Sequence, residues 1–205
     1  MFTKRALIAF FAVAVCISPL FAQDQGKKPE NKKPEDKKPE QTEAMIGKPA
    51  PTFELKGCDG KTYKLADYKD KTVVLEWWNQ DCPVCKKYMP EMKYMAKKYA
   101  EKGVVWLAID STHYQTAEKD KEYASANSIE YPILMDKDGK VGREYQARTT
   151  PHMFVIHKGT LVYDGAIDNQ GSRNYVAEAL DAVLADKDVP LAKTKPFGCG
   201  VKYAK

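Results

Sequence analysis

Residues 77–92 read WWNQDCPVCKKYMPEM, and the interpretation of the whole chain depends on this stretch. Cys82 and Cys85 are separated by two residues, the first of which is Pro83. A C-x-x-C pair of this kind serves as half of a zinc site, as a redox dithiol or as part of a structural disulfide framework. An apolar run precedes the pair and a helical pattern follows it, so the pair lies between a strand and a helix.

The strand and the helix on either side of the pair limit its chemistry. Residues 72–78, TVVLEWW, form a short apolar run that predicts a buried strand, and apolar residues spaced by three and four predict an amphipathic helix over 83–101. Cys82 then lies at a helix N-terminus, where free backbone N–H groups and the helix dipole favour the thiolate. Cys85 follows about one turn later, within reach of a mixed disulfide formed on Cys82.

The rest of the chain alternates buried strands with helices. This order predicts an α/β fold with a mixed central sheet flanked by helices and an N-terminal β-hairpin extension. The predicted hairpin covers 53–65, further strands cover 104–109, 131–135, 152–157 and 160–165, and further helices cover 115–127, 141–147 and 174–186.

The first 44 residues are predicted to lie outside the folded domain. Residues 1–22 carry Lys4 and Arg5 before an apolar run of about 15 residues, the layout of a secretory signal peptide. An uncleaved membrane anchor is the alternative, although a spanning helix needs about 20 apolar residues. Residues 23–44 repeat KKPE at a period of five and predict a disordered, neutral linker.

One domain over 45–190 and a C-terminal tail over 191–205 complete the predicted organisation. The whole chain carries a formal charge of +5, from 33 Lys and Arg against 28 Asp and Glu. Removal of 1–22 would lower this to +3, which is too small an excess to favour a nucleic-acid partner. We expect no cofactor and no metal ion.

Export would leave four cysteines in an oxidising compartment. The spacing favours a redox-active disulfide between Cys82 and Cys85. Cys58 and Cys199 would remain as a candidate structural pair. A four-cysteine zinc site is disfavoured, because the chain has a single C-x-x-C motif.

Two other positions are candidates for the site. Glu76 lies inside the apolar run VVLEWW, six residues before Cys82. Its carboxyl group either reaches solvent at the strand end or is buried, and a buried group with a raised pKa could exchange a proton with Cys85. Thr150 and Pro151 precede a predicted strand, and a cis bond there would present the Thr150 backbone to a substrate polypeptide.

Together these segments resemble the thioredoxin superfamily, and most closely its exported TlpA/ResA-like redoxin branch of AhpC/TSA type. The resemblance covers roughly 46–186 and rests on GKPAPTFELKGCDGKTYKLADYKDKTVVLEWW, CPVCKKYMP and TTPHMFVIHKGTLVYDG. It implies a thioredoxin-like fold in an exported, periplasmic or extracytoplasmic thiol–disulfide oxidoreductase. The implied partners are protein thiols or disulfides and an upstream redox protein, with a membrane tether if the signal is uncleaved.

The resemblance also assigns a role to individual residues. It implies that Cys82 attacks, that Cys85 resolves, that Pro151 is a cis-proline and that Glu76 is the buried acid. The chain departs from the family pattern at Asp81, where the family usually has a tryptophan.

Two alternatives share this scaffold. A peroxiredoxin-like thiol peroxidase would need a hydroxyl residue three positions before the cysteine, where this chain has Asn79. A Sco-like copper protein would use C-x-x-x-C with a histidine, and His152 follows Pro151. The C-x-x-C spacing is one residue too short for that site, and an ordinary strand role explains His152 better.

Overall fold

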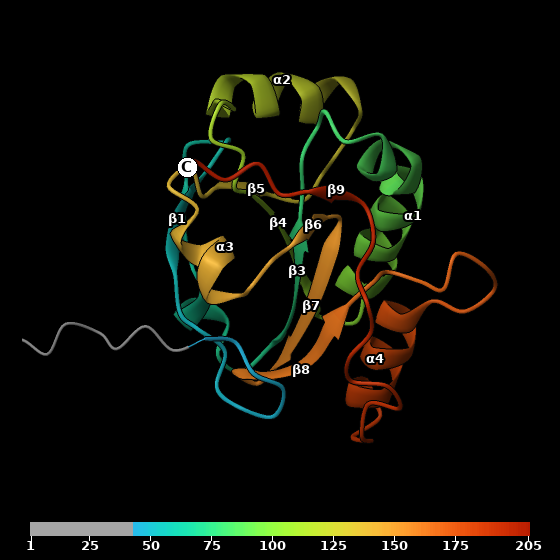
Figure 1. Ribbon diagram of the computed structural model, residues 1–205. Helices are drawn as coiled ribbons and strands as arrows, with labels where there is room; N and C mark the ends of the chain where they lie inside the picture. The colour runs from blue at the N-terminus through green and yellow to red at the C-terminus, as the bar shows by residue number, and fades with distance from the viewer. Residues whose placement is uncertain (1–42) are drawn as a thin grey trace, which may run out of the picture. The chain divides into compact units, whose positions relative to one another are not determined.

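The computed structural model describes residues 43–205 (Figure 1). The predicted signal peptide, and the predicted linker up to residue 42, lie outside the described residues. Within 43–205, no helix is both long enough and apolar enough to span a bilayer.

A seven-stranded mixed sheet forms the centre of the domain, with strand order β2-β1-β5-β4-β3-β7-β8. The strands β3, β4 and β5 are parallel, whereas β7 and β8 form an antiparallel hairpin and β1 and β2 form a second hairpin. The mixed sheet and the N-terminal hairpin confirm the predicted fold class. The strand bounds are β1 Glu54–Gly57, β2 Thr62–Lys64, β3 Thr72–Trp77, β4 Val105–Asp110, β5 Ile133–Met135, β7 His152–His157 and β8 Thr160–Gly165.

The helices cover the sheet in layers (Figure 1). On one face, α1 and α4 pack against β3, β4, β7 and β8, while α3 lies on the other face and α2 lies beyond the carboxyl ends of the parallel strands. A parallel sheet is buried on both faces, and the helices that connect its strands provide this cover. The bounds are η1 Leu65–Tyr68, α1 Pro83–Ala100, α2 Ala117–Ala126, α3 Lys140–Glu144 and α4 Tyr175–Leu184.

Strand β3 lies at the centre of the core, and all six of its residues are buried. Val73, Leu75 and Trp77 face the side covered by α3, whereas Val74 faces the side covered by α1 and α4. Side chains alternate between the two faces of a strand, so Glu76 points to the same side as Val74. The sequence thus places a carboxyl group in the apolar layer beneath α1.

The C-terminal tail returns to the end of the sheet and forms a second, two-stranded sheet (Figure 1). Its strand β9, Cys199–Gly200, pairs antiparallel with β6, Thr149–Thr150. Beyond β9, the Val201 N–H donates to the Arg148 carbonyl oxygen at 3.1 Å, and the Tyr203 hydroxyl donates to the Ala147 carbonyl oxygen at 2.8 Å. The tail is therefore a docked segment of the domain, which the sequence did not predict.

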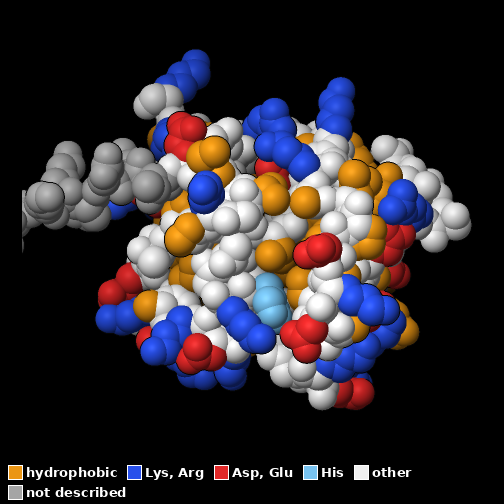
Figure 2. All heavy atoms as spheres, turned by 90° about the horizontal axis from the view of Figure 1, so that it is seen from below, with side chains coloured by type: hydrophobic (Ala, Val, Ile, Leu, Met, Phe, Trp, Pro, Cys, Tyr) orange, Lys and Arg blue, Asp and Glu red, His pale blue; other side chains and the backbone are white. Residues whose placement is uncertain are grey.

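The face opposite to α2 carries charges of both signs. Figure 2 shows lysines and arginines interspersed with aspartates and glutamates over this face, and hydrophobic side chains scattered between them. This mixture agrees with the nearly balanced composition of the chain.

Candidate active site at the Cys82–Cys85 dithiol

The dithiol lies where the chain leaves β3 and enters α1. Cys82 is the residue immediately before the helix, with extended backbone angles, and Pro83 occupies the first helical position. Proline is favoured there because its missing N–H would have had no helical partner. The exposed fraction of Cys82 is 2% and that of Cys85 is zero. The predicted placement of Cys82 at a helix N-terminus is confirmed.

Hydrogen bonds to Cys82 favour its thiolate form. The hydrogen bond from the Cys85 thiol is the main reason that the pKa of Cys82 falls to about 4. Burial opposes this change, and a hydrogen bond from the Cys199 side chain lowers the pKa further. In its protonated form Cys82 Sγ donates to the Thr150 carbonyl oxygen at 3.0 Å. A thiolate cannot donate, so this last contact belongs to the thiol state alone.

The environment of Cys85 has the opposite effect on its thiol. Burial raises the pKa of Cys85 well above its usual range, and the hydrogen bond to Cys82 and the negative charges of Cys82 and Glu76 raise it further. The two sulfurs are therefore chemically different. Cys82 is suited to attack and to leave as an anion, whereas Cys85 stays protonated until a base removes its proton.

Glu76 is fully buried, which excludes the alternative that its side chain reaches solvent. The Trp106 indole N–H donates to Glu76 Oε2 at 2.8 Å. Burial raises the pKa of Glu76 to about 7, and the hydrogen bonds from Trp106 and Tyr131 oppose this rise. Oε1 has no partner within good hydrogen-bond geometry among residues 43–205, so the Tyr131 contact is looser than the Trp106 bond.

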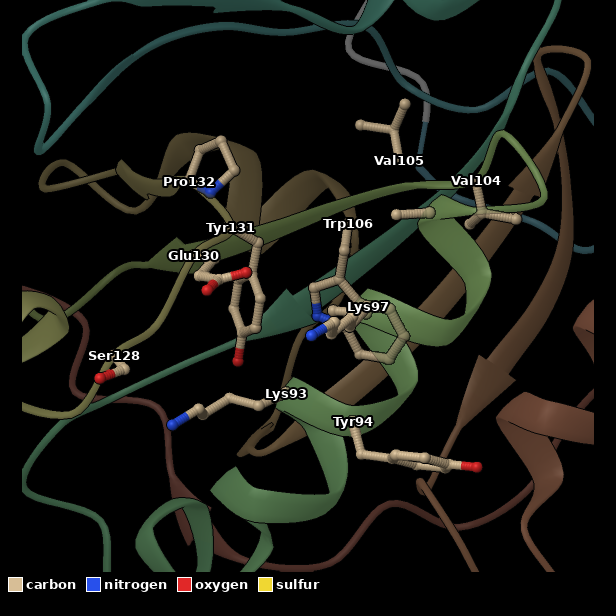
Figure 3. Close-up of a pocket in the computed structure, with 12 residues that line it drawn as sticks. Lys93, Tyr94, Lys97, Val104, Val105, Trp106, Ser128, Glu130, Tyr131 and Pro132 are labelled. Atoms are coloured by element: carbon tan, nitrogen blue, oxygen red, sulfur yellow. The ribbon is translucent and has the colours of Figure 1, made fainter.

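A surface hollow lies beside the two aromatic partners of Glu76 (Figure 3). Trp106 and Tyr131 line it from the sheet side, and Lys93 and Lys97 line it from α1. No cysteine belongs to its lining. The hollow therefore brings solvent near the partners of Glu76 without reaching the dithiol.

The Thr150–Pro151 peptide bond is cis, as the resemblance implied. The Thr150 carbonyl oxygen lies against Cys82 Sγ, at the distance given above. The backbone edge that the sequence assigned to a substrate polypeptide is already paired with Cys199 of β9. All four cysteines of the described chain are free thiols, and the candidate Cys58–Cys199 pairing stays a prediction.

Comparisons with known proteins agree with this geometry. The model of the AhpC/TSA family matches residues 46–164, which is more than half of the chain. The chain belongs to the AhpC/TSA family. A relative from Bacillus thuringiensis subsp. konkukian (strain 97-27), the thiol-disulfide oxidoreductase ResA, is 33% identical over 139 residues, covering 68% of this chain and 76% of the relative. The thioredoxin-like protein YneN of Bacillus subtilis (strain 168) is 31% identical over 122 residues, or 58% of this chain and 69% of YneN.

Solved structures support the same assignment. A conserved protein from Geobacillus kaustophilus is 30% identical with a TM-score of 0.71, covering 78% of this chain and 93% of that one. A putative thiol:disulfide interchange protein DsbE from Chlorobium tepidum is 26% identical with a TM-score of 0.54. The match covers 59% of this chain and 84% of the DsbE chain. The predicted thioredoxin-like fold and thiol–disulfide oxidoreductase activity are confirmed.

His152, the histidine considered for a copper site, takes part in an internal hydrogen-bond network in this AhpC/TSA-family chain. Its Nε2 lies 2.8 Å from Asp164 Oδ1, and its Nδ1 accepts the Arg148 N–H at 3.3 Å. Burial lowers the pKa of His152. Both ring nitrogens are therefore engaged in the folded protein, and His152 orients the segment that leads into β6.

Two features of the AhpC/TSA-family site were not predicted from the sequence. The first is the contact between Cys199 and Cys82. The second is a buried acidic pair, Asp110 and Asp120, in which burial and then the charge of Asp110 raise the pKa of Asp120 to about 8. Asp81 lies near this pair and accepts a hydrogen bond from Gln115 Nε2 at 3.1 Å, so it does not cap α1. Asp110 ends a buried strand and Asp120 lies on a polar helix, so no local pattern links them.

Proposed function

We propose that the chain exchanges disulfides with protein substrates through Cys82 as the attacking cysteine and Cys85 as the resolving one. The observation that carries this proposal is the opposite effect of the site on the two sulfurs. The pKa of Cys82 is lowered to about 4, mainly by the hydrogen bond from Cys85, whereas burial raises the pKa of Cys85. A stable thiolate beside a protected thiol is the arrangement that a two-step exchange requires.

In the reductive direction, the Cys82 thiolate attacks one sulfur of a substrate disulfide. The bond between the two substrate sulfurs breaks, and a mixed disulfide to Cys82 forms while the other substrate sulfur leaves as a thiolate. Cys85 then loses its proton and attacks Cys82 Sγ. The products are a Cys82–Cys85 disulfide and a fully reduced substrate, and the reverse sequence oxidises a substrate dithiol.

Glu76 is the proposed acceptor of the Cys85 proton. Its negative charge is near enough to raise the pKa of Cys85, and its own pKa of about 7 allows both protonation states near neutrality. A base with such a pKa can take a proton and return it in the reverse reaction. Glu76 does not touch the substrate, so we assign it the role of a proton carrier beneath the dithiol.

The partners and the location form part of the same proposal. Protein thiols and disulfides are the substrate class, and an upstream redox protein regenerates the reduced dithiol. The signal-like segment 1–22 supports action outside the cytoplasm, in the periplasm or an equivalent compartment. Retention of that segment would tether the domain to the membrane through the linker.

The test uses insulin reduction by the full chain with Cys82→Ser and Cys85→Ser. Cys82→Ser is expected to abolish turnover, and Cys85→Ser is expected to accumulate a mixed disulfide with insulin. The matched control is Cys58→Ser, because Cys58 is outside the dithiol hydrogen bonds and should leave turnover unchanged. Full activity of Cys82→Ser would rule out the proposed mechanism.

A further inference from the structure

The tail is fitted closely to the backbone edge beside the dithiol. Cys199 pairs with Thr150 and Gly200 pairs with Thr149. Immediately before this pairing, Gly198 has a φ of +141°, and a Cβ atom added there would collide with the Thr150 carbonyl group. Glycine is therefore required at 198 for the tail to approach so closely.

Contacts on both sides of Cys199 hold the tail in place. Phe197 packs on Tyr88 of α1 with ring centroids 5.7 Å apart. On the other side, the Arg143 guanidinium lies over the Tyr203 ring, 4.8 Å from its centroid. Contacts on the N-terminal and the C-terminal side of Cys199 therefore hold this residue in its position.

The Cys199 side chain meets the attacking cysteine itself. It packs against the apolar cluster that contains Cys82 and Cys85, and it lies near enough to Cys82 to lower the pKa of that thiol. Only 2% of Cys82 is exposed while the tail is docked, so an external disulfide cannot reach Sγ until a segment that covers it moves. A cysteine therefore occupies the position beside Cys82 that a substrate cysteine would take on this edge.

We propose that Cys199 is a third redox-active cysteine and that the tail is an internal substrate, which exchanges disulfides with Cys82. This proposal rests on the proposed role of Cys82 as the attacking cysteine. It places the oxidised protein in two forms, one with a Cys82–Cys85 disulfide and one with a Cys82–Cys199 disulfide.

The exchange is balanced without an added oxidant or reductant. The Cys199 thiolate attacks Cys82 Sγ of the Cys82–Cys85 disulfide, the bond between Cys82 and Cys85 breaks, and a bond between Cys82 and Cys199 forms. The electron pair of the broken bond stays on Cys85, which takes up one proton, while Cys199 has lost one. Two cysteines remain oxidised and one remains reduced throughout.

The first experiment maps disulfides in full-length Cys85→Ser. The protein is treated with oxidised glutathione, and the thiols that remain free are then blocked with N-ethylmaleimide. Glutathione first adds to Cys82, and Cys199 is expected to displace it. Trypsin then yields peptide 72–86 joined to peptide 194–202, because the Lys195–Pro196 bond resists cleavage. Cys82 left bound to glutathione with Cys199 free would overturn the proposal. So would peptide 57–61, which carries Cys58, joined to 194–202.

The second experiment measures how fast iodoacetamide alkylates Cys82 in reduced protein, with no substitution of a cysteine. Gly198→Ala should displace the tail and speed alkylation about tenfold, the scale expected of an overpacked contact. Gly200→Ala is the matched control, because a Cβ atom at 200 meets open space, and it should alkylate at the wild-type rate. Equal rates in all three proteins would show that the tail does not cover Cys82.

The two proposals fail in different ways. If Cys82→Ser loses insulin reduction but Cys85→Ser shows no link between peptides 72–86 and 194–202, the proposed role of Cys199 is refuted. The proposed exchange function then still stands. Insulin reduction that persists in Cys82→Ser would remove the exchange mechanism itself. The cross-link and the alkylation rate therefore report on the tail separately from turnover.

Discussion

Replacement of Glu76 by glutamine gives a sharp test of the buried carboxyl group. Glutamine has nearly the same shape, and its side-chain oxygen can still accept the Trp106 indole hydrogen bond, which is 2.8 Å long in the wild type. Unlike glutamate, it does not titrate. The comparison of Glu76→Gln with the wild type therefore isolates the free energy of placing a charge at this position.

The magnitude follows from the pKa change. Burial raises the pKa of Glu76 from 4.5 to about 7, so the folded protein keeps a proton that the unfolded chain has already released. The wild type therefore loses stability as the pH rises through this window, and the loss is complete above pH 7. At about 1.4 kcal/mol for each tenfold change in proton affinity, the loss is about 3 kcal/mol. Glu76 is fully buried, so solvent screening does not reduce this figure.

The assay is a set of urea unfolding curves for the reduced proteins between pH 4.5 and pH 8. The free energies of unfolding should nearly agree at pH 4.5, and Glu76→Gln should be more stable by about 3 kcal/mol at pH 8. With a urea slope of about 2 kcal/mol/M, the midpoints at pH 8 should differ by about 1.5 M. The control Glu122→Gln changes an exposed glutamate on α2 and should follow the wild type at every pH.

The same variant tests the proposed proton transfer. Glutamine cannot accept the Cys85 proton, so disulfide exchange at pH 7 should slow about tenfold or more, in line with general-base contributions of ~10²-fold and above. A stability difference that does not change with pH would refute the reasoning about burial. An unchanged exchange rate across pH 5 to 9 would refute the role of Glu76 as the proton carrier.

Two other groups in the site give further predictions. Cys199→Ala removes one of the hydrogen bonds that lower the pKa of Cys82, so that pKa should rise above its wild-type value of about 4, as measured by thiolate absorbance at 240 nm. A Cys82 pKa unchanged by the substitution would contradict the contact. Burial and then the charge of Asp110 raise the pKa of Asp120 to about 8, so the wild type should lose stability between about pH 4 and pH 8. Asp120→Asn should therefore be more stable than the wild type at pH 8 and not at pH 4, as measured by urea unfolding, whereas a difference of the same size at both pH values would count against the buried pair.

Most of the fold could be predicted because its signals are local. The apolar run at 72–78 and the helical spacing after Pro83 appear in the structure as β3 and α1. The hairpins form at the expected turns, and η1 was missed because a single 3₁₀ turn has no periodic pattern. The short strand β9 was also missed, since two residues beside a glycine do not show the alternation of a strand.

The site could be predicted only in part. Cys82, Cys85 and Glu76 were found because they lie on one continuous segment around the turn from strand to helix. The partners that determine the chemistry, Trp106 on Glu76 and Cys199 on Cys82, come from distant parts of the chain. Their positions depend on sheet register and on the docking of the tail, and neither is encoded in a local spacing.

The pairing of β9 with β6 also affects how tightly any partner can bind. A polypeptide that needs the Thr150 edge competes with a segment already attached to the same chain, so it binds only the molecules in which that segment has left. Its apparent dissociation constant is then the intrinsic one divided by the undocked fraction. With about one molecule in a hundred undocked, the apparent affinity for such a polypeptide would weaken about hundredfold. Only partners with a large additional contact surface would then bind tightly enough to react. Competition from its own C-terminus would thus make this domain selective among disulfides that are chemically alike.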